Sequence, residues 1–233
     1  ISTLSELLQL MDRLSGARAA IFYRVAATPP VLKTMLHANA MKLPTYYEID
    51  DLIFDPTFHP DPFESFEGQI SITEYTGLQF GVPLFRHALK ACQSFIASTP
   101  ALAHHMQPLT SSGTGIVVRN GLDERNEEAV LMGSHPLRRG KGKVRIFYGS
   151  GTKAHNADFN NLVGGALLDL MRRNPNVELV IVGYLKLMSE FDEFKLRIRT
   201  YPFLSDLTAY WSILASCDIN LAVLEPSRAA DCK

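Results

Sequence analysis

The stretch Val144-Arg-Ile-Phe-Tyr-Gly-Ser-Gly-Thr-Lys-Ala-His-Asn-Ala-Asp-Phe159 joins an apolar run to a glycine-containing turn and then to a helical pattern. It predicts a buried strand over 144–148 and a helix over about 158–173. In open α/β sheets, ligands bind beyond the carboxyl ends of the strands. Glycines at that place let the backbone approach an anion, and the next helix presents free N–H groups to it. The stretch therefore indicates a parallel sheet with a candidate phosphate or diphosphate site at its end.

The turn itself supplies the groups that such a site needs. Lys153 would add a movable positive charge and His155 a hydrogen-bond donor. The spacing of a P-loop is missing, and no third glycine completes a dinucleotide motif. The alternative is a plain strand-to-helix turn in which Asn156 or Asp158 caps the helix. The residues that would form the cradle of backbone amides and hydroxyls are Gly149, Ser150, Gly151 and Thr152.

The rest of the chain alternates short β-prone runs with helical patterns, which predicts parallel sheets covered by helices on both faces. Strands are expected at 20–25, 44–49, 94–98, 115–119, 177–182, near 195–199 and at 218–224, and helices at 4–14, 29–41, about 84–91, 99–106 and 207–216. The stretch between the two runs mixes charges with glycine and proline, as linkers do. The chain is thus predicted to be α/β, with Rossmann-like domains at 1–125 and 143–233 and a linker at 126–142.

Composition excludes several classes of protein. The 233 residues are 46% apolar and 20% charged with a net charge of −1, so the chain lacks a global basic field for binding nucleic acid, which leaves only a local basic patch as an alternative. No apolar run approaches the ~20 residues of a membrane span. The three cysteines are widely spaced, which argues against a disulfide framework and a zinc site. Cys92 and Cys217 are expected in the core, and the cytoplasm is the expected compartment.

Several segments, taken in order, resemble a known family. Phe147–Phe159, Asn174–Gly183 and Tyr210–Pro226 resemble the donor half of a GT-B glycosyltransferase of the retaining, group 1 (family 4-like) type. Tyr47–Phe54, Ile96–Ala103 and Val117–Leu122 resemble the acceptor half. Compared with that family, the chain looks truncated at both ends, so the two domains are expected to be partial and this piece inactive by itself.

The resemblance implies transfer of a sugar from a nucleotide sugar to a glycan or lipid-linked acceptor, with the anomeric configuration retained. Relatives often serve polysaccharide assembly, which would place the acceptor at the membrane surface. No Asp-x-Asp metal pair lies near the glycine turn, so we expect neither a metal nor another cofactor. Backbone amides and basic side chains would stabilise the departing diphosphate instead.

On the donor side, the family pattern assigns roles beyond the glycine turn. Lys153 would be the counter-charge of the diphosphate. His155 would contact the donor or order the loop, and Asp158 would bind the donor or stabilise the helix terminus. Phe203 would contact the base, with a place in the core as the alternative. Glu225 would accept hydroxyl hydrogen bonds or simply form a turn with Pro226. Lys233 corresponds to a family lysine near the donor.

On the acceptor side, Asp50 and Asp51 end a predicted strand and Arg24 follows another. The two carboxylates would bind sugar hydroxyls, or would cap the next loop. Arg24 would bind an acceptor phosphate such as a lipid diphosphate. Lys153, His155 and Asp51 are the residues expected to act in the transfer step.

Two other functions stay open at this point. One is a GT-B-like sugar-nucleotide epimerase or phosphorylase. The other is a glycosyltransferase-like module that binds a nucleotide or a partner without turnover.

Overall fold

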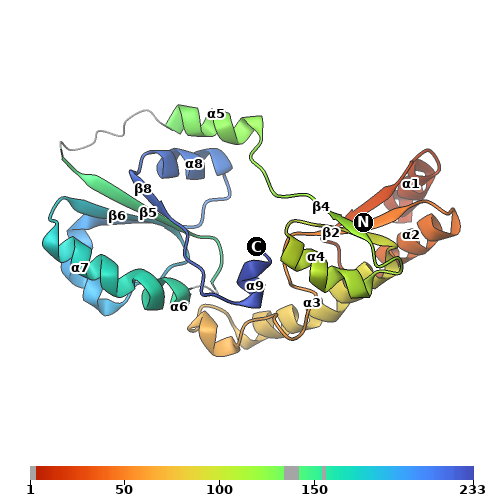
Figure 1. The fold of residues 1–233 in the computed structure, drawn as a ribbon, viewed down its shortest axis with the longest axis horizontal. Coiled ribbons are helices and arrows are strands. Elements are labelled where there is room, and N and C mark those ends of the chain that lie inside the picture. Colours follow the sequence, from red (N-terminus) through yellow and green to blue (C-terminus); the bar gives the residue numbers. More distant parts are fainter. Residues whose placement is uncertain (1–3, 134–141, 154–155) are drawn as a thin grey trace. The chain divides into compact units, whose positions relative to one another are not determined.

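The computed structural model describes residues 4–133, 142–153 and 156–233, which form two compact units (Figure 1). The first unit falls within residues 1–61, 71–120 and 226–233, and the second within 62–70 and 121–225. These units differ from the predicted division, because residues 62–70 belong with the second unit and residues 226–233 with the first. Part of the predicted linker is helical, and its residues 134–141 lie outside the described part of the chain.

The first unit contains a parallel four-stranded sheet in the order β1-β2-β3-β4. Its strands are β1 (Ala20–Tyr23), β2 (Thr45–Ile49), β3 (Ser94–Ala97) and β4 (Gly115–Val117). Its helices are α1 (Leu4–Leu14), α2 (Pro29–Ala40), α3 (Ile72–Ala91), α4 (Pro100–Met106) and α9 (Arg228–Asp231). Among the described helices, even the 20-residue α3 is not long and apolar enough to cross a membrane.

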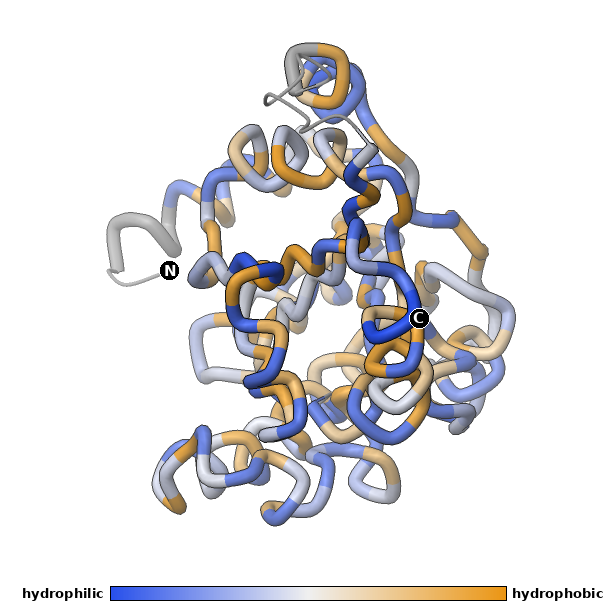
Figure 2. The backbone as a smooth tube through the Cα atoms, turned by 90° about the vertical axis from the view of Figure 1, so that its left-hand side faces the viewer, coloured by the Kyte–Doolittle hydropathy of each residue, from blue (hydrophilic) through white to orange (hydrophobic). Residues whose placement is uncertain are grey.

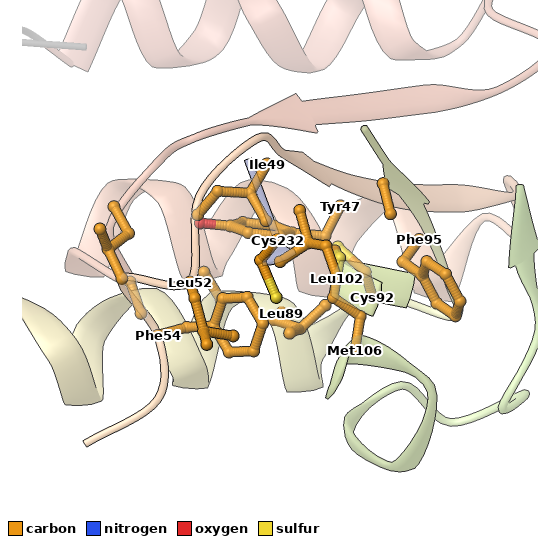
Figure 3. Packing of buried hydrophobic residues seen from close by; sticks show 14 of the residues in the cluster. Tyr47, Ile49, Leu52, Phe54, Leu89, Cys92, Phe95, Leu102, Met106 and Cys232 are labelled. Carbon is orange, nitrogen blue, oxygen red and sulfur yellow. The ribbon is translucent and has the colours of Figure 1, made fainter. Parts of the chain in front are cut away.

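The core of this unit lies against one face of the sheet. Tyr47 and Ile49 of β2 pack with Leu89 of α3 and with Leu102 of α4, and Cys232 is buried beside them (Figure 3). The Tyr47 hydroxyl donates to the carbonyl of Val25 at 2.8 Å, and burial raises its pKa. This phenol therefore stays protonated and hydrogen-bonded inside the core.

The opposite face of this sheet differs from the prediction that helices cover both faces. Ile21, Tyr23 and Ile116 are each more than half exposed within the described part of the chain. They come from β1 and β4, the two outer strands of the sheet.

Helix α3 begins earlier than the predicted start near residue 84. Ser71 forms a capping box with Glu74, in which each side chain bonds the backbone N–H of the other residue. Those bonds satisfy N–H groups at the helix start, so the helix runs from Ile72 and tolerates Pro83 inside it.

The second unit contains the other parallel sheet, in the order β7-β6-β5-β8. Its strands are β5 (Val144–Ser150), β6 (Val177–Gly183), β7 (Ile198–Tyr201) and β8 (Ile219–Leu221). Its helices are α5 (Glu124–Gly133), α6 (Asn156–Phe159), α7 (Gly165–Arg173) and α8 (Leu207–Ala215), with a π-helical turn at Asn160–Gly164 between α6 and α7 and 3-10 turns at Phe63–Phe66 and Ser189–Arg197.

Both faces of this second sheet are covered, as predicted. Ile146 and Tyr148 of β5 pack with Leu167 of α7, whereas Phe147 packs on the other face with Tyr210 of α8. Successive strand residues point to opposite faces, so a strand buried on both sides is mostly apolar, although β5 also contains the buried Arg145. Figure 2 shows apolar and polar residues following each other along the helical turns, as expected for helices that bury only one side.

Helix α5 occupies a segment that composition marks as a linker, and it packs against α8 (Figure 1). The backbone N–H of Asn126 donates to the Asp123 carboxylate at 2.9 Å, which is the geometry of a helix N-cap. Ala129 is buried in the described part of this helix.

The sheet order contains one reversal. The chain passes from β5 to β6 to β7 on one side and then returns to place β8 on the other side of β5. Arg145 and Asp218 hold this pairing, since the Arg145 N–H donates to the Asp218 carboxylate at 2.8 Å and the Asp218 N–H donates to the Arg145 carbonyl at 2.9 Å. In such sheets, a crevice opens at the carboxyl ends of the two strands where the order reverses.

Gly183 fixes how closely β5 and β6 approach at those carboxyl ends. It has φ +111°, and a Cβ there would overlap the backbone carbonyl oxygen of Ser150. We expect Gly183→Ala to lower the free energy of unfolding by about 2 to 3 kcal/mol, because the backbone is both strained and obstructed.

Gly165→Ala is the matched control. Gly165 lies at a helical backbone position with nothing within 4 Å of a Cβ, so alanine is expected to stabilise by about 0.5 to 1 kcal/mol. Urea unfolding followed by circular dichroism measures both variants. Equal midpoints for the two would contradict this account of Gly183.

Candidate functional site

The second unit has a pocket of about 390 Å³ at the carboxyl ends of β5 and β8. Gly149–Thr152 line one side, Asn220–Leu224 line another, and the side chain of Tyr210 reaches it from α8. The pocket thus lies where the strand order reverses. It brings the predicted glycine turn together with the end of β8.

The residues predicted to form the cradle differ in their exposure and in the space around them. Ser150 is buried and its hydroxyl donates to the Thr152 carbonyl at 3.0 Å, which fixes the turn. Gly149 touches Tyr210 so closely that a Cβ would overlap the phenol oxygen, whereas nothing lies within 4 Å of a Cβ on Gly151. The backbone at Gly151 is therefore accessible to a ligand.

Two tyrosines beside the cradle remain protonated at neutral pH. Burial raises the pKa of Tyr210, whose ring makes an edge contact with Phe147 at 5.6 Å between centroids. Burial, and then the negative charge of Asp158, raise the pKa of Tyr148. Neither phenol therefore acts as a base at neutral pH.

Lys153 does not line the pocket but lies next to an aromatic pair. Its ammonium donates to the backbone carbonyl of Gln69 at 2.8 Å and lies 5.6 Å from the centroid of the Tyr184 ring. Tyr184 stacks on Phe203 with 5.4 Å between centroids and 16° between the planes. Phe203 is 49% exposed, so the predicted alternative of a core phenylalanine is not what the structure has.

The helix that follows the glycine turn is held by Asn156. Its amide nitrogen donates to the Glu67 carboxylate, and its amide oxygen accepts from the Lys186 N–H at 2.6 Å. His155, which precedes it, lies outside the described residues. Asn156 therefore ties the helix start to two other loops of the unit.

Asp158 and Glu225 are brought together. The Asp158 carboxylate accepts from the backbone N–H of Glu225 at 3.3 Å, which ties helix α6 to the segment after β8. The side chain of Glu225 is exposed. Glu225 directly follows Leu224, which lines the pocket, so this hydrogen bond lies beside the pocket.

In the first unit, the three predicted acceptor residues form one ion-paired group at the carboxyl ends of β1 and β2. The Arg24 guanidinium lies 2.9 Å from the Asp50 carboxylate and 3.8 Å from the Asp51 carboxylate. The backbone of Arg24 is left-handed, with φ 45°. Asp51 also accepts from the Leu52 N–H at 3.2 Å, as the capping alternative expects. An acceptor phosphate would have to compete with two carboxylates for Arg24.

His59 joins this group, although its sequence context gave no signal. Burial lowers its pKa; Asp51 and Asp61 oppose that shift, and Arg24 and Lys233 add to it. Lys233, predicted to lie near the donor, therefore lies in the first unit within electrostatic reach of His59.

Sequence reasoning missed Tyr184, Tyr210 and the Asn220–Leu224 wall of the pocket. Tyr184 directly follows β6, so its place at a carboxyl strand end was a usable signal. Nothing in the local sequence indicates that Tyr210 of α8 touches Gly149, because that contact depends on the strand order.

Within the described residues, no group of three or more His, Cys, Asp or Glu side chains is placed to hold a metal ion. The three cysteines are buried free thiols, and the prediction that Cys92 and Cys217 are core residues is confirmed. Burial raises the pKa of Cys92 to about 12, so it is an unreactive thiol.

No protein-family model matches the chain, and no curated protein matches it in sequence. Among solved structures it is similar to a UDP-forming α,α-trehalose-phosphate synthase from Burkholderia xenovorans, with TM-score 0.52, 12% identity, and coverage of 93% of this chain and 56% of that one.

Two further solved structures are similar at lower scores. Anabaena HepE in complex with UDP and glucose gives TM-score 0.47 at 13% identity, covering 92% of this chain and 54% of that one. UDP-GlcNAc 2-epimerase from Neisseria meningitidis, bound to UDP-GlcNAc, gives 0.48 at 14% identity, covering 92% and 57%.

The comparison with the synthase shows the fold. Two parallel four-stranded sheets with flanking helices match the GT-B type, so the predicted α/β class with two Rossmann-like parallel-sheet domains is confirmed. The chain spans little more than half the length of the solved structures it matches.

Asn156 provides a test of the local geometry. We expect Asn156→Ala to lower the free energy of unfolding by about 1 to 3 kcal/mol, because it leaves the Lys186 N–H and the Glu67 carboxylate without this amide. Asn161→Ala, at an exposed position on the same helical segment, should change stability by less than about 0.5 kcal/mol. Thermal unfolding of both variants measures these changes. If Asn156→Ala loses no more stability than Asn161→Ala, the Asn156 side chain does not hold the helix start.

Proposed function

We propose that the protein transfers a sugar from a nucleotide-sugar donor to a glycan or lipid-linked acceptor, with retention and without a metal. The donor binds in the second unit, and the acceptor binds near Arg24, Asp50 and Asp51 of the first. In this proposal the protein acts in the cytoplasm, and a lipid-linked acceptor lies at the membrane surface.

The observation that carries the proposal is the pocket between the ends of β5 and β8. Ligands of open α/β sheets bind where the strand order reverses. One wall of this pocket is the backbone of Gly149–Thr152, and Gly151 is open to close approach. A diphosphate accepts hydrogen bonds from such amides at little cost, because they are already oriented.

The side chains around the pocket have separate roles in this proposal. Lys153 leaves the Gln69 carbonyl and neutralises the diphosphate as the glycosidic bond breaks. The base of the nucleotide stacks on the exposed ring of Phe203, which Tyr184 supports from the other side. The side chain of Glu225 accepts hydrogen bonds from ribose or sugar hydroxyls. His155 contacts the donor next to Lys153.

Two measurements on the intact protein test the activity. A thermal-shift panel of UDP-, GDP- and dTDP-sugars identifies the donor, since a ligand that binds only the folded state stabilises it. Incubation with that donor and a glycan acceptor should release the nucleoside diphosphate and lengthen the glycan. An altered free nucleotide sugar would indicate an epimerase instead, and binding without any turnover would indicate a binding module.

Gly151→Val tests the cradle directly. The structure has room for the side chain, so thermal stability should be kept, whereas the valine would hold a diphosphate away from the backbone. Losing one charge-assisted hydrogen bond predicts about a tenfold or greater rise in the dissociation constant. Calorimetry with the best nucleotide sugar measures it; an unchanged value would remove Gly151 from the site.

Lys153→Ala tests the counter-charge. We expect the affinity for the nucleotide sugar to fall about ten- to a hundredfold, with less than about 1.5 kcal/mol lost in stability from the Gln69 hydrogen bond. Lys195→Ala removes an exposed lysine elsewhere in the unit and should leave affinity unchanged. If the two variants bind alike, Lys153 does not contact the diphosphate.

A further inference from the structure

The first unit contains a second pocket, of about 560 Å³, which none of Arg24, Asp50 and Asp51 lines. Its charged and titratable side chains come from elements far apart in sequence: Asp55 after β2, Arg86 on α3, His104 and His105 on α4, and Arg228 and Asp231 on α9. This volume falls within the range of pockets that hold small organic ligands.

Two guanidinium groups face this pocket. Arg86 is half-buried, and its Nη1 makes a long hydrogen bond of 3.5 Å to the Phe54 carbonyl, which leaves other N–H donors for a ligand. Arg228 is exposed and makes no ion pair or side-chain hydrogen bond within the described residues. Guanidinium groups bind phosphate through paired hydrogen bonds, so two of them in one pocket suit a phosphate ester.

The imidazole of His105 is held from two sides. Its Nδ1 lies 3.6 Å from the Asp55 carboxylate, and its ring makes an edge contact with Phe58 at 5.6 Å between centroids. Asp55 also accepts from the Thr57 N–H at 3.0 Å. This side of the pocket is therefore preorganised, with an oriented ring and an oriented carboxylate.

The carboxylates of the pocket favour an anion that also carries hydroxyl groups over a bare phosphate. Asp55 and Asp231 would repel a bare phosphate but accept hydrogen bonds from hydroxyl groups. A metal does not account for them, because the described residues contain no group of three or more ligating side chains placed for one. The ligand that satisfies both sets of groups carries a phosphate at one end and hydroxyls at the other.

We infer that this pocket binds a phosphorylated sugar or polyol. Arg86 and Arg228 hold its phosphate, while Asp55 and Asp231 accept its hydroxyls. The inference stands apart from the proposed function, because the pocket contains none of the residues that the proposed function assigns to the donor or the acceptor.

Calorimetry on the full chain with three probes tests the inference. Glucose 6-phosphate is expected to bind with a dissociation constant below about 1 mM and at least about tenfold more tightly than inorganic phosphate, and glucose without phosphate is expected to show no binding. Equal affinities for glucose 6-phosphate and inorganic phosphate, or no binding of glucose 6-phosphate, would overturn it.

Variants locate the binding. Arg86→Ala and Arg228→Ala should each weaken glucose 6-phosphate binding by about tenfold or more, and Arg228→Lys by less, because lysine keeps the charge without the planar fork. Lys90→Ala, an exposed cation of α3 that does not line the pocket, should leave it unchanged. If Arg86→Ala fails to fold, Arg228→Ala still decides, and unchanged affinity there would refute the assignment.

Nucleotide-sugar binding separates the two proposals. The same arginine variants should bind the nucleotide sugar of the second unit with unchanged affinity. A loss of glucose 6-phosphate binding alone supports the second pocket even where the donor site fails its own tests. A parallel loss of nucleotide-sugar affinity in Arg228→Ala would contradict a ligand held by the first unit only.

Discussion

Strand β8 pairs with β5, and that pairing depends on the reciprocal hydrogen bonds between Arg145 and Asp218. The Arg145 side chain is buried and lies 3.4 Å from Glu178 of β6, so one residue links three neighbouring strands. A buried charge without its partner is costly, which makes other registers of β5 unfavourable. These contacts hold β6 and β8 on opposite sides of β5, where the strand order reverses.

The candidate site is a consequence of that reversal. The connection after β5 leads toward α6, whereas β8 arrives on the other side, and the pocket forms between their carboxyl ends. Gly183 brings β6 close to Ser150, so the backbone before the glycine turn is rigid while Gly151 stays open. A rigid frame around an accessible backbone segment is what binding of an anion by amides requires.

The sequence predicted the two parallel sheets because buried strands such as β5 and β6 are mostly apolar, with Arg145 and Glu178 as their charged residues, and such a pattern depends on local residues alone. It also located the glycine turn. It missed the early start of α3, although Ser71 and Glu74 have capping-box spacing, and it missed α5 behind Asp123, since the nearby glycines and charges resemble a linker. Contacts such as Tyr210 with Gly149 depend on strand order, which no local pattern contains.

A crystal structure of the intact protein with UDP would show where the nucleotide binds. We expect the diphosphate between the ends of β5 and β8, with its oxygens within hydrogen-bond distance of backbone N–H groups of Gly149–Thr152 and with the base against Phe203. A nucleotide bound elsewhere on the chain, with this pocket empty, would contradict that expectation.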